Sequence, residues 1–243
     1  MLKLLAFRRR SWYKCKYMKG FAKHCCLLLF LLQGVLWGQT PRGADLEVSD
    51  SRAVNLLQMT KEKMDKWSDV TVDFVMTTTM PDQTQNKQTG KLYQQGTKYR
   101  LELPDRTLVC DGHSMWSYLR DANEIQIQDA ADVRDEGYAT PLDWLKIYDD
   151  QTYFFALVDQ IQEKGQTLDL IEFKSKARDE EVSKARLSLD PLGIPRALEI
   201  FYRDGVRMIL QLNTLKPNQQ LAASLFKMDV SKYPDAHVED LRF

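Results

Sequence analysis

Two side chains that could do acid–base chemistry, Asp111 and His113, lie two positions apart. A carboxylate beside an imidazole is a candidate catalytic pair. Gly112 lies between them, however, and Asp-Gly is typical of a tight turn between two strands, which accounts for the aspartate without catalysis. The sequence contains no Gly-x-Ser-x-Gly elbow, no phosphate-cradling glycine loop and no His-Glu-x-x-His helix. We therefore predict no catalytic residue and no cofactor. Carboxylate sites leave little trace in a sequence, so these absences do not exclude an enzyme, and a secreted hydrolase that uses carboxylates is the less favoured alternative.

Metal-ligating residues are sparse and scattered. After residue 38 the only histidines are His113 and His237, which lie far apart in the sequence. The three consecutive acidic residues at 179–181 are more typical of a solvated hairpin loop than of a cation site. Cys110 is the only cysteine after residue 38, so it can form neither an intramolecular disulfide nor a cysteine-based metal site. We predict that it is a small buried hydrophobe and that the protein has no metal site.

The first forty residues are typical of an export signal. A basic segment with Lys19 and Lys23 precedes an unbroken apolar run at 25–32, and Gly38 offers a small residue before a cleavage point. The run is shorter than the roughly 20 apolar residues that span a bilayer. We therefore expect cleavage near Gln39 and an exported, soluble mature chain.

This signal predicts three parts: a cleaved leader at 1–38, a flexible segment at 39–48 and a single domain at 49–243. The long basic prefix leaves two alternatives open, a true start at Met18 or a twin-arginine signal around Arg9 and Arg10. No cysteine follows the apolar run directly, so nothing there indicates a lipid anchor on the mature chain.

The net charge of the chain changes when the leader is removed. The whole chain has 34 Lys and Arg and 34 Asp and Glu, whereas the leader has 8 basic residues and no acidic one. The predicted mature chain thus has 26 basic and 34 acidic residues. A protein that tracks phosphates needs a basic excess, so we expect no nucleic-acid partner. The remaining chain of about 205 residues is long enough for one domain with a sizeable core.

Most of the chain alternates apolar and polar residues with period two, which predicts strands. An apolar stripe first predicts a helix at 49–67, capped by Ser49 or Asp50. Thr140 and Pro141 begin a second, short helix, while 129–139 is expected to be irregular. Consecutive hairpins favour a mainly β, antiparallel sheet that is curved or closed, with the helices on one face or in its mouth. Strands are predicted at 71–80, 91–95, 98–103, 107–110, 114–119, 125–127, 168–174, 184–190, 196–203, 206–215 and 224–229.

Large apolar and aromatic side chains are abundant on these strands. They support two interpretations, a sandwich or barrel core of ordinary kind or a cavity lined for an apolar ligand. Periodicity alone favours the core. The residues concerned include Phe74, Tyr93, Tyr99, Trp116, Tyr118, Phe173, Phe201 and Tyr202.

A more specific pattern lies between residues 90 and 127. It reads Gly90-Lys91-Leu92-Tyr93, Lys98-Tyr99-Arg100, Cys110-Asp111-Gly112-His113-Ser114-Met115-Trp116-Ser117-Tyr118 and Asn123-Glu124-Ile125-Gln126-Ile127. The Asp-Gly-x-x-x-Trp-x-Tyr run and the strand after it resemble the LolA family, the periplasmic carriers of outer-membrane lipoproteins. Thr140-Pro141 looks like the lid segment of that family, and the segment from Phe226 to Arg242 is similar to its C-terminal strand and tail. The resemblance spans residues 49–242.

The resemblance implies a fold and a function. The fold is an incomplete antiparallel β-barrel, open on one side, whose mouth is closed by a helical lid. The function is that of a monomeric periplasmic carrier, not an enzyme, which shields the acyl chains of lipoproteins between the two membranes. Loading takes place at an ABC-type lipoprotein-releasing complex of the inner membrane, whereas the outer-membrane acceptor is unknown. The same fold also occurs in envelope lipid or stress sensors and regulatory modules, the second alternative, and in outer-membrane receptors, which the missing anchor cysteine disfavours.

The site residues are predicted on the same basis. The best-known members carry a basic residue and a proline where this chain has Gln-Gly-Thr at 95–97, so we predict Lys98 or Arg100 as the polar latch. The lid is predicted to present Trp144, Leu145 and Tyr148. Contacts with acyl chains are predicted at Phe74, Met76, Leu92, Tyr99, Leu101, Leu103, Trp116, Tyr118, Ile125 and Ile127.

Overall fold

One antiparallel sheet dominates the computed structural model, which describes residues 49–135, 140–146, 152–163, 165–177 and 180–242. The predicted leader and flexible segment lie outside the described residues, and so does Tyr148. Twelve strands in the described part of the chain pair in the order β12-β6-β5-β4-β3-β2-β1-β11-β10-β9-β8-β7. The strands are β1 Val70–Thr79, β2 Gln85–Gln95, β3 Lys98–Glu102, β4 Arg106–Cys110, β5 Ser114–Leu119, β6 Glu124–Asp129, β7 Tyr153–Glu163, β8 Gln166–Ser175, β9 Val182–Leu189, β10 Pro195–Tyr202, β11 Arg207–Pro217 and β12 His237–Asp240.

The topology confirms the predicted fold class of a mainly β, open antiparallel sheet. Most neighbours in the sheet are hairpins, and β1 pairs with β11 to join the two halves of the chain. The exception is β12, which lies parallel to β6. Because β12 and β7 end the order at opposite edges, the sheet is not closed into a barrel. Five hairpin turns between the described strands have a glycine at a positive φ, among them Gly96 at 57° and Gly112 at 97°.

The first helix, α1, runs from Ser51 to Met64, close to the predicted 49–67. The side chain of Asp50 caps it by accepting a hydrogen bond from the backbone N–H of Arg52 (3.0 Å). The backbone N–H of Asp50 donates to the carbonyl of Phe155 (2.9 Å), which fixes the start of the helix against the edge strand β7. The apolar stripe faces the sheet, and the buried residues of this face are Ala53, Leu57 and Thr60.

Two predicted elements are wrong. The segment 129–139 is not irregular as far as the structure describes it, because Ala130–Asp135 forms helix α2, which packs Ala130 and Val133 against the core. The segment 224–229 is not a strand. Instead Ala223–Phe226 and Val230–Lys232 are short 3-10 helices, η2 and η3, and the edge of β6 is taken by β12. Long-range packing has overridden local strand propensity in that segment.

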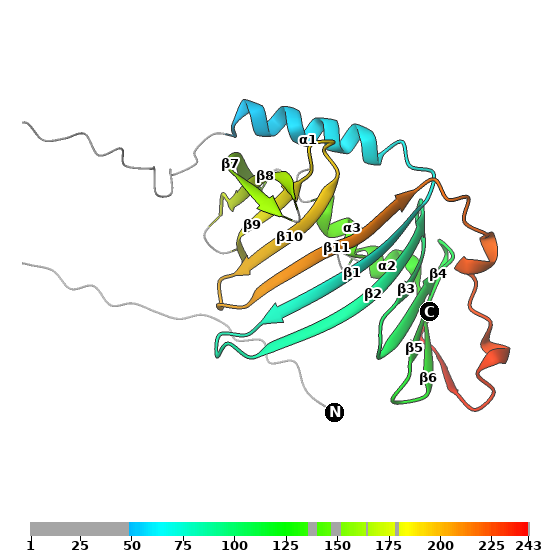
Figure 1. The fold of residues 1–243 in the computed structure, drawn as a ribbon. Coiled ribbons are helices and arrows are strands. Elements are labelled where there is room, and N and C mark those ends of the chain that lie inside the picture. The colour runs from blue at the N-terminus through cyan, green and yellow to red at the C-terminus, as the bar shows by residue number, and fades with distance from the viewer. Residues whose placement is uncertain (1–48, 136–139, 147–151, 164, 178–179, 243) are drawn as a thin grey trace, which may run out of the picture. The chain divides into compact units, whose positions relative to one another are not determined.

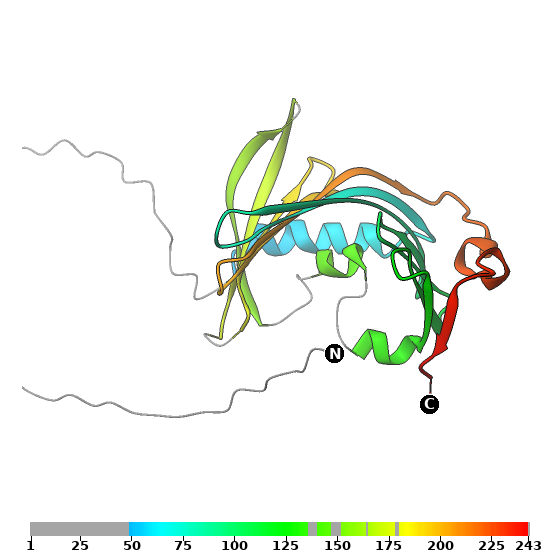
Figure 2. The same ribbon diagram turned by 90° about the horizontal axis from the view of Figure 1, so that it is seen from below.

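The sheet is strongly curved, and the helices lie inside its curve. Figure 2 shows the sheet arching over α1 and over the short helix α3, Pro141–Trp144, with α2 also on the concave side. The main apolar core lies between the concave face and these helices. The C-terminal segment with η2, η3 and β12 runs along the opposite, outer side of β3–β6 (Figure 1). The concave face is therefore the candidate binding face.

Candidate functional site

An apolar row crosses six strands on the concave face. Residues that pair directly across an antiparallel ladder share one face of the sheet. The registers place six side chains in one such row, one after the other: Leu157, Ile171, Leu187, Leu198, Leu210 and Met76. The four central members, all from β8 to β11, are fully buried.

The row continues into the other half of the sheet. Val72, Phe74 and Met76 alternate along β1 and so point to the same side. Val72 pairs with Leu92, and from there the ladder leads through Leu101 to Leu108. The concave face is thus one continuous apolar wall from β7 to β4.

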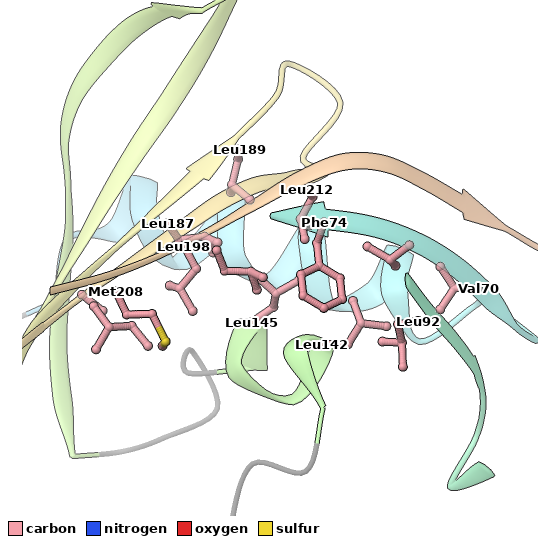
Figure 3. Close-up of a cluster of buried hydrophobic side chains, with 14 of the residues drawn as sticks. Val70, Phe74, Leu92, Leu142, Leu145, Leu187, Leu189, Leu198, Met208 and Leu212 are labelled. Atoms are coloured by element: carbon pink, nitrogen blue, oxygen red, sulfur yellow. The ribbon is translucent and has the colours of Figure 1, made fainter. Parts of the chain in front are cut away.

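Helix α3 fills the hollow in front of this wall. Leu142 and Leu145 of this segment are buried, and Trp144 packs against the core. In Figure 3 both leucines point toward the sheet, on the side where Phe74, Leu92 and Leu198 lie. The segment brings only four helical residues, so its apolar side chains, not its length, hold it in place.

The start of α3 is fixed by polar contacts. Thr140 and Asp143 form a capping box, in which the Thr140 hydroxyl lies 2.8 Å from Asp143 Oδ2 and the Thr140 backbone N–H donates to the same atom (2.9 Å). The Thr140 hydroxyl also lies 3.3 Å from Oε1 of Gln94, on β2. Lys146 Nζ is 3.6 Å from Asp143 Oδ1 at the surface. The N-cap and first-turn roles predicted for Thr140 and Pro141 are confirmed.

Little empty space is left beside this helix. A cavity of about 170 Å³ lies between the end of α1, α3 and the start of β1. This is below the roughly 300–1,000 Å³ of typical ligand pockets. Its lining is formed by Met64, Asp65, Trp67, Ser68, Asp69, Val70, Gln94, Gly96, Leu142 and Lys146. The hollow in this structure is therefore occupied by the protein's own leucines.

The structure divides the predicted acyl-contact residues between two faces. Trp116 pairs with Val109 and Ile127, while Tyr118 pairs with Ile125. These pairs alternate with the row that contains Leu101 and so lie on the outer face. The outer-face members are Trp116, Tyr118, Ile125 and Ile127. The concave-face members are Phe74, Met76, Leu92, Tyr99, Leu101 and Leu103, all of which belong to the core or pack against it. The predicted lid residues Trp144 and Leu145 join them there, and both the lid role and the acyl contacts stay predictions.

Of these four residues, Tyr118 and Ile125 lie under the C-terminal segment. Ile125 and Phe226 are fully buried there. The rings of Tyr118 and Tyr233 lie with centroids 4.3 Å apart. Asn123 Nδ2 donates to the carbonyl of Asp235 (2.9 Å), which holds the segment beside β6. This part of the outer face is covered by the chain itself.

Both predicted latch residues also lie on the outer face. Arg100 pairs with Tyr93 and Val109, and its Nε donates to Glu102 Oε1 (2.7 Å). Lys98 is exposed at the start of β3. The polar residue that the structure brings to α3 is Gln94, which sequence reasoning missed. The available signal was its position two residues after Leu92, because residues two apart in a strand point to the same face.

Sequence reasoning also missed the largest part of the wall, in β8–β11. The alternation in these strands predicts the strands themselves, but it does not mark any of their residues as a site residue. The signal was the spacing of two between successive apolar residues in each strand. The missed wall residues are Ile171, Phe173, Leu187, Leu189, Leu198, Ile200, Met208, Leu210 and Leu212.

The candidate catalytic pair is a turn. Oδ1 of Asp111 accepts the backbone N–H groups of His113 and Ser114, both at 2.9 Å, and the His113 side chain is exposed. Burial raises the pKa of Asp111, but the hydrogen bonds from the backbone N–H groups of Ser114 and His113 outweigh this effect and lower the pKa below its ordinary value.

Within the described part of the chain, no three His, Cys, Asp or Glu side chains are grouped as metal ligands. Of the acidic run at 179–181, residue 179 lies outside the described residues and the other two are exposed. None of the described helices is long and apolar enough to span a membrane.

Similar proteins are found among solved structures and among protein families. Among solved structures, the chain is similar to the lipoprotein LppX of Mycobacterium tuberculosis (10% identity, 72% of this chain, 100% of that chain, TM-score 0.47). It is also similar to a LolA superfamily protein from Nitrosomonas europaea (11% identity, 73% of this chain, 98% of that chain, TM-score 0.36). A further similar structure is the MucA/MucB complex of Pseudomonas aeruginosa (10% identity, 74% of this chain, 62% of that chain, TM-score 0.39). No curated protein matches the chain. The family model for the outer membrane lipoprotein carrier protein LolA matches residues 65–229. Since this match covers more than half of the sequence, the chain belongs to the LolA family.

Proposed function

We propose that this protein is a periplasmic carrier that binds the acyl chains of lipoproteins in the concave hollow and moves them from the inner to the outer membrane. The observation that carries this proposal is the continuous apolar wall from β7 to β4, covered in front by the leucines of a four-residue helix. Helices α1 and α2 also cover this face, but the part in front of Phe74, Leu92 and Leu198 is left to the short α3 segment.

In this proposal Leu142 and Leu145 occupy the place of cargo. Both side chains are buried against the wall, and each methylene kept from water contributes about 0.8 kcal/mol. When an acyl chain displaces them, the wall exchanges one set of apolar contacts for another. The free energy of loading is then small, which a carrier that must also release its cargo requires.

The energetics also decide how cargo must be transferred. Each methylene that leaves an apolar environment for water costs about 0.8 kcal/mol, so moving several long acyl chains from the membrane into water would cost tens of kcal/mol. Non-covalent affinities end near ~18–21 kcal/mol, so no protein can extract such chains from a membrane through water unaided. The cargo therefore passes directly from membrane to hollow, with an inner-membrane ABC-type releasing complex as the energy source. An acceptor at the outer membrane, still to be identified, would remove it, and the carrier acts as a monomer.

A secreted hydrolase that uses carboxylates is less well supported. The wall of the hollow is built from leucine, isoleucine, phenylalanine and methionine side chains. Such a lining stabilises hydrocarbon and disfavours the charged carboxylates that hydrolysis needs. The carrier proposal is therefore the one to test first.

A binding experiment with a matched pair of variants tests the site. The probe is a synthetic tripalmitoylated cysteinyl peptide, and its co-elution with the mature protein is measured by gel filtration and native mass spectrometry. Leu198→Asn places a polar group on the concave wall, and Ile125→Asn places the same group on the outer face; both residues are fully buried. Both variants lose stability, because a buried amide without partners is costly. Only Leu198→Asn should lose the probe beyond what unfolding explains, and equal losses would contradict the hollow as the site.

Depletion in the native envelope tests the function itself. Loss of the protein should leave outer-membrane lipoproteins in the inner membrane, as measured by fractionation. Correct placement after depletion would overturn the carrier proposal. Affinity purification from the envelope distinguishes the alternative of a sensor, because a carrier retains acylated lipoproteins and the releasing complex, whereas a sensor retains a transmembrane regulator.

A further inference from the structure

The sheet splits between β2 and β3 at Gly90. The β2–β3 ladder ends at the pair Lys91 and Glu102, whereas β2 continues beside β1 down to Gln85. Gly90 therefore has a ladder partner only on the β1 side, where it faces Phe74. Beyond Glu102 the chain turns into the next hairpin, and the backbone N–H of Leu103 donates to Arg106 (2.9 Å). Figure 1 shows β2 and β3 diverging in this region.

Side chains, and not backbone hydrogen bonds, close this split. A Cβ at position 90 would lie 2.3 Å from Phe74 Cζ and 2.8 Å from Leu103 Cδ2, so these two side chains occupy the space that the glycine leaves. Phe74 belongs to the concave core and Leu103 packs against it. Rotation of these two side chains would therefore open the wall here, because no hydrogen bond between β2 and β3 has to break at this position.

A polar groove lies next to the closed split. It has a volume of about 440 Å³, and Phe74, Gly90, Leu103 and Pro104 form its apolar part. The remaining lining is polar and consists of Asp73, Thr89, Lys91, Glu102 and Asn213. Asp73, Lys91 and Glu102 are cross-strand neighbours, with Lys91 Nζ 3.8 Å from Asp73 Oδ1. Apolar wall and polar groove thus meet at Phe74.

We propose that the split at Gly90 is the passage between hollow and solvent for the head of an acylated cargo, an inference that rests on the proposed carrier function. The acyl chains lie along the concave wall, while the glyceryl esters and the lipidated cysteine lie in the groove. Ester and amide carbonyls accept hydrogen bonds from Lys91 and Asn213, and the amide N–H groups of the cargo donate to Asp73 or Glu102.

The chemistry of the head explains why it needs such a groove. Burying an ester or amide without hydrogen-bond partners costs about 2–7 kcal/mol, depending on the reference state, so the head cannot remain inside an apolar hollow. The competing exit is the space of about 170 Å³ beside α3, which has polar lining residues of its own. The groove at Gly90 is larger and adjoins the wall directly through Phe74.

Two cross-linking probes locate the head and the tail of the cargo. The head probe is a dipalmitoylated cysteinyl peptide with a photoreactive diazirine on the residue that follows the cysteine. The tail probe carries the diazirine at the end of one acyl chain. After irradiation of the complex, mass spectrometry should find the head probe on residues 89–91 and 102–104 and the tail probe on 187–198. Head labelling at residues 64–70 or 142–146 would overturn the proposal, because it would place the exit beside α3.

Two substitutions test the passage. Gly90→Ala places a methyl group in the split itself, which rotation of Phe74 and Leu103 cannot remove, so head labelling at 89–91 should fall. Lys91→Gln removes the cation of the groove but keeps a polar side chain of similar size, and it should weaken head-probe binding by about tenfold or more, the scale of one hydrogen bond to a charged group. The matched control is Lys87→Gln, an exposed lysine on the same strand and face, which should change nothing.

The same samples separate this inference from the proposed function. Co-elution of the probe is measured before irradiation. If neither probe co-elutes with the wild-type protein, the carrier function is contradicted. If both co-elute and Lys91→Gln and Lys87→Gln behave alike, only the passage is contradicted.

Discussion

The ring of Phe74 occupies the space above Gly90 where any other residue would have a side chain. A Cβ built at Gly90 comes within 2.3 Å of Phe74 Cζ, far inside van der Waals contact. Gly90 has no positive φ, so space and not backbone conformation requires the glycine. This contact joins β1 to β2 at the edge of the apolar wall, where the ladder to β3 has ended.

We predict that Gly90→Ala destabilises the protein by ~1–3 kcal/mol, the usual cost of an overpacked core. Phe74→Leu shortens the side chain that clashes, so the double variant should lose less stability than the sum of the two single variants. Denaturant unfolding of all four proteins gives the coupling energy, which should be about 0.5–3 kcal/mol in favour of the pair. Additive losses would show that the ring can leave Gly90 freely.

The N-cap of α3 should control access to the hollow. Thr140→Ala removes the hydroxyl that caps the helix next to Gln94, and such a loss costs about 0.5–2 kcal/mol. A lid held by few polar contacts then opens more often, so a dye that binds exposed apolar surface should bind more strongly, and the lipopeptide should associate faster. Thr140→Ser keeps the hydroxyl and is the control. Unchanged dye binding in Thr140→Ala would mean that the cap does not hold the lid.

Leu145 should compete with cargo. Leu145→Ala deletes a fully buried side chain, so the free protein should lose ~2–5 kcal/mol of stability. At the same time its affinity for the tripalmitoylated peptide should rise, because less apolar contact must be given up on loading. Ile125→Ala, equally buried but on the outer face, should cost stability without a gain in affinity. Calorimetric unfolding and titration of the peptide measure the two effects, and a parallel fall in both quantities for Leu145→Ala would rule out competition.

The pKa of Asp240 reports on the C-terminal segment. Hydrogen bonds from the Arg242 side chain and backbone lower this pKa from 3.8 to about 2. A pKa that is lower in the folded state favours the ionised form, so the stabilising effect is present at neutral pH and is lost as the pH falls from about 4 toward 2. Arg242→Gln should return the pKa toward 3.8 in an NMR titration.

The carboxyl of Asp229 serves as the control in that titration. Its pKa is lowered chiefly by a hydrogen bond from the Ser231 side chain, which the Arg242 substitution does not touch. The pKa of Asp229 should therefore be the same in the wild-type protein and in Arg242→Gln. If the pKa of Asp240 is also unchanged in Arg242→Gln, the contact between Asp240 and the Arg242 side chain does not form in solution.

The sequence by itself determined the elements whose causes are local. Alternation with period two predicts β1 to β6 and β8 to β11, because successive side chains of a strand point to opposite faces, whereas β7 is missed. The apolar stripe predicts α1, and Thr140 with Pro141 predicts the start of α3, because caps act within one turn. Asp111 before Gly112 predicts the turn that the structure shows. The family motif between residues 90 and 127 also lies within a few consecutive strands.

Only the tertiary structure decided which face of each strand points toward the hollow and which lies on the outer side of the sheet. Alternation separates Leu101 from Arg100 and Tyr118 from Ser117, but it does not say which member of each pair faces the hollow. That depends on the curvature of the whole sheet and on its coverings, α3 on one side and the C-terminal segment on the other. Tyr118 and Ile125 therefore lie under a segment more than a hundred residues away, although their sequence context looks the same as that of Leu92. Burial is set by such distant partners, which a local pattern cannot name.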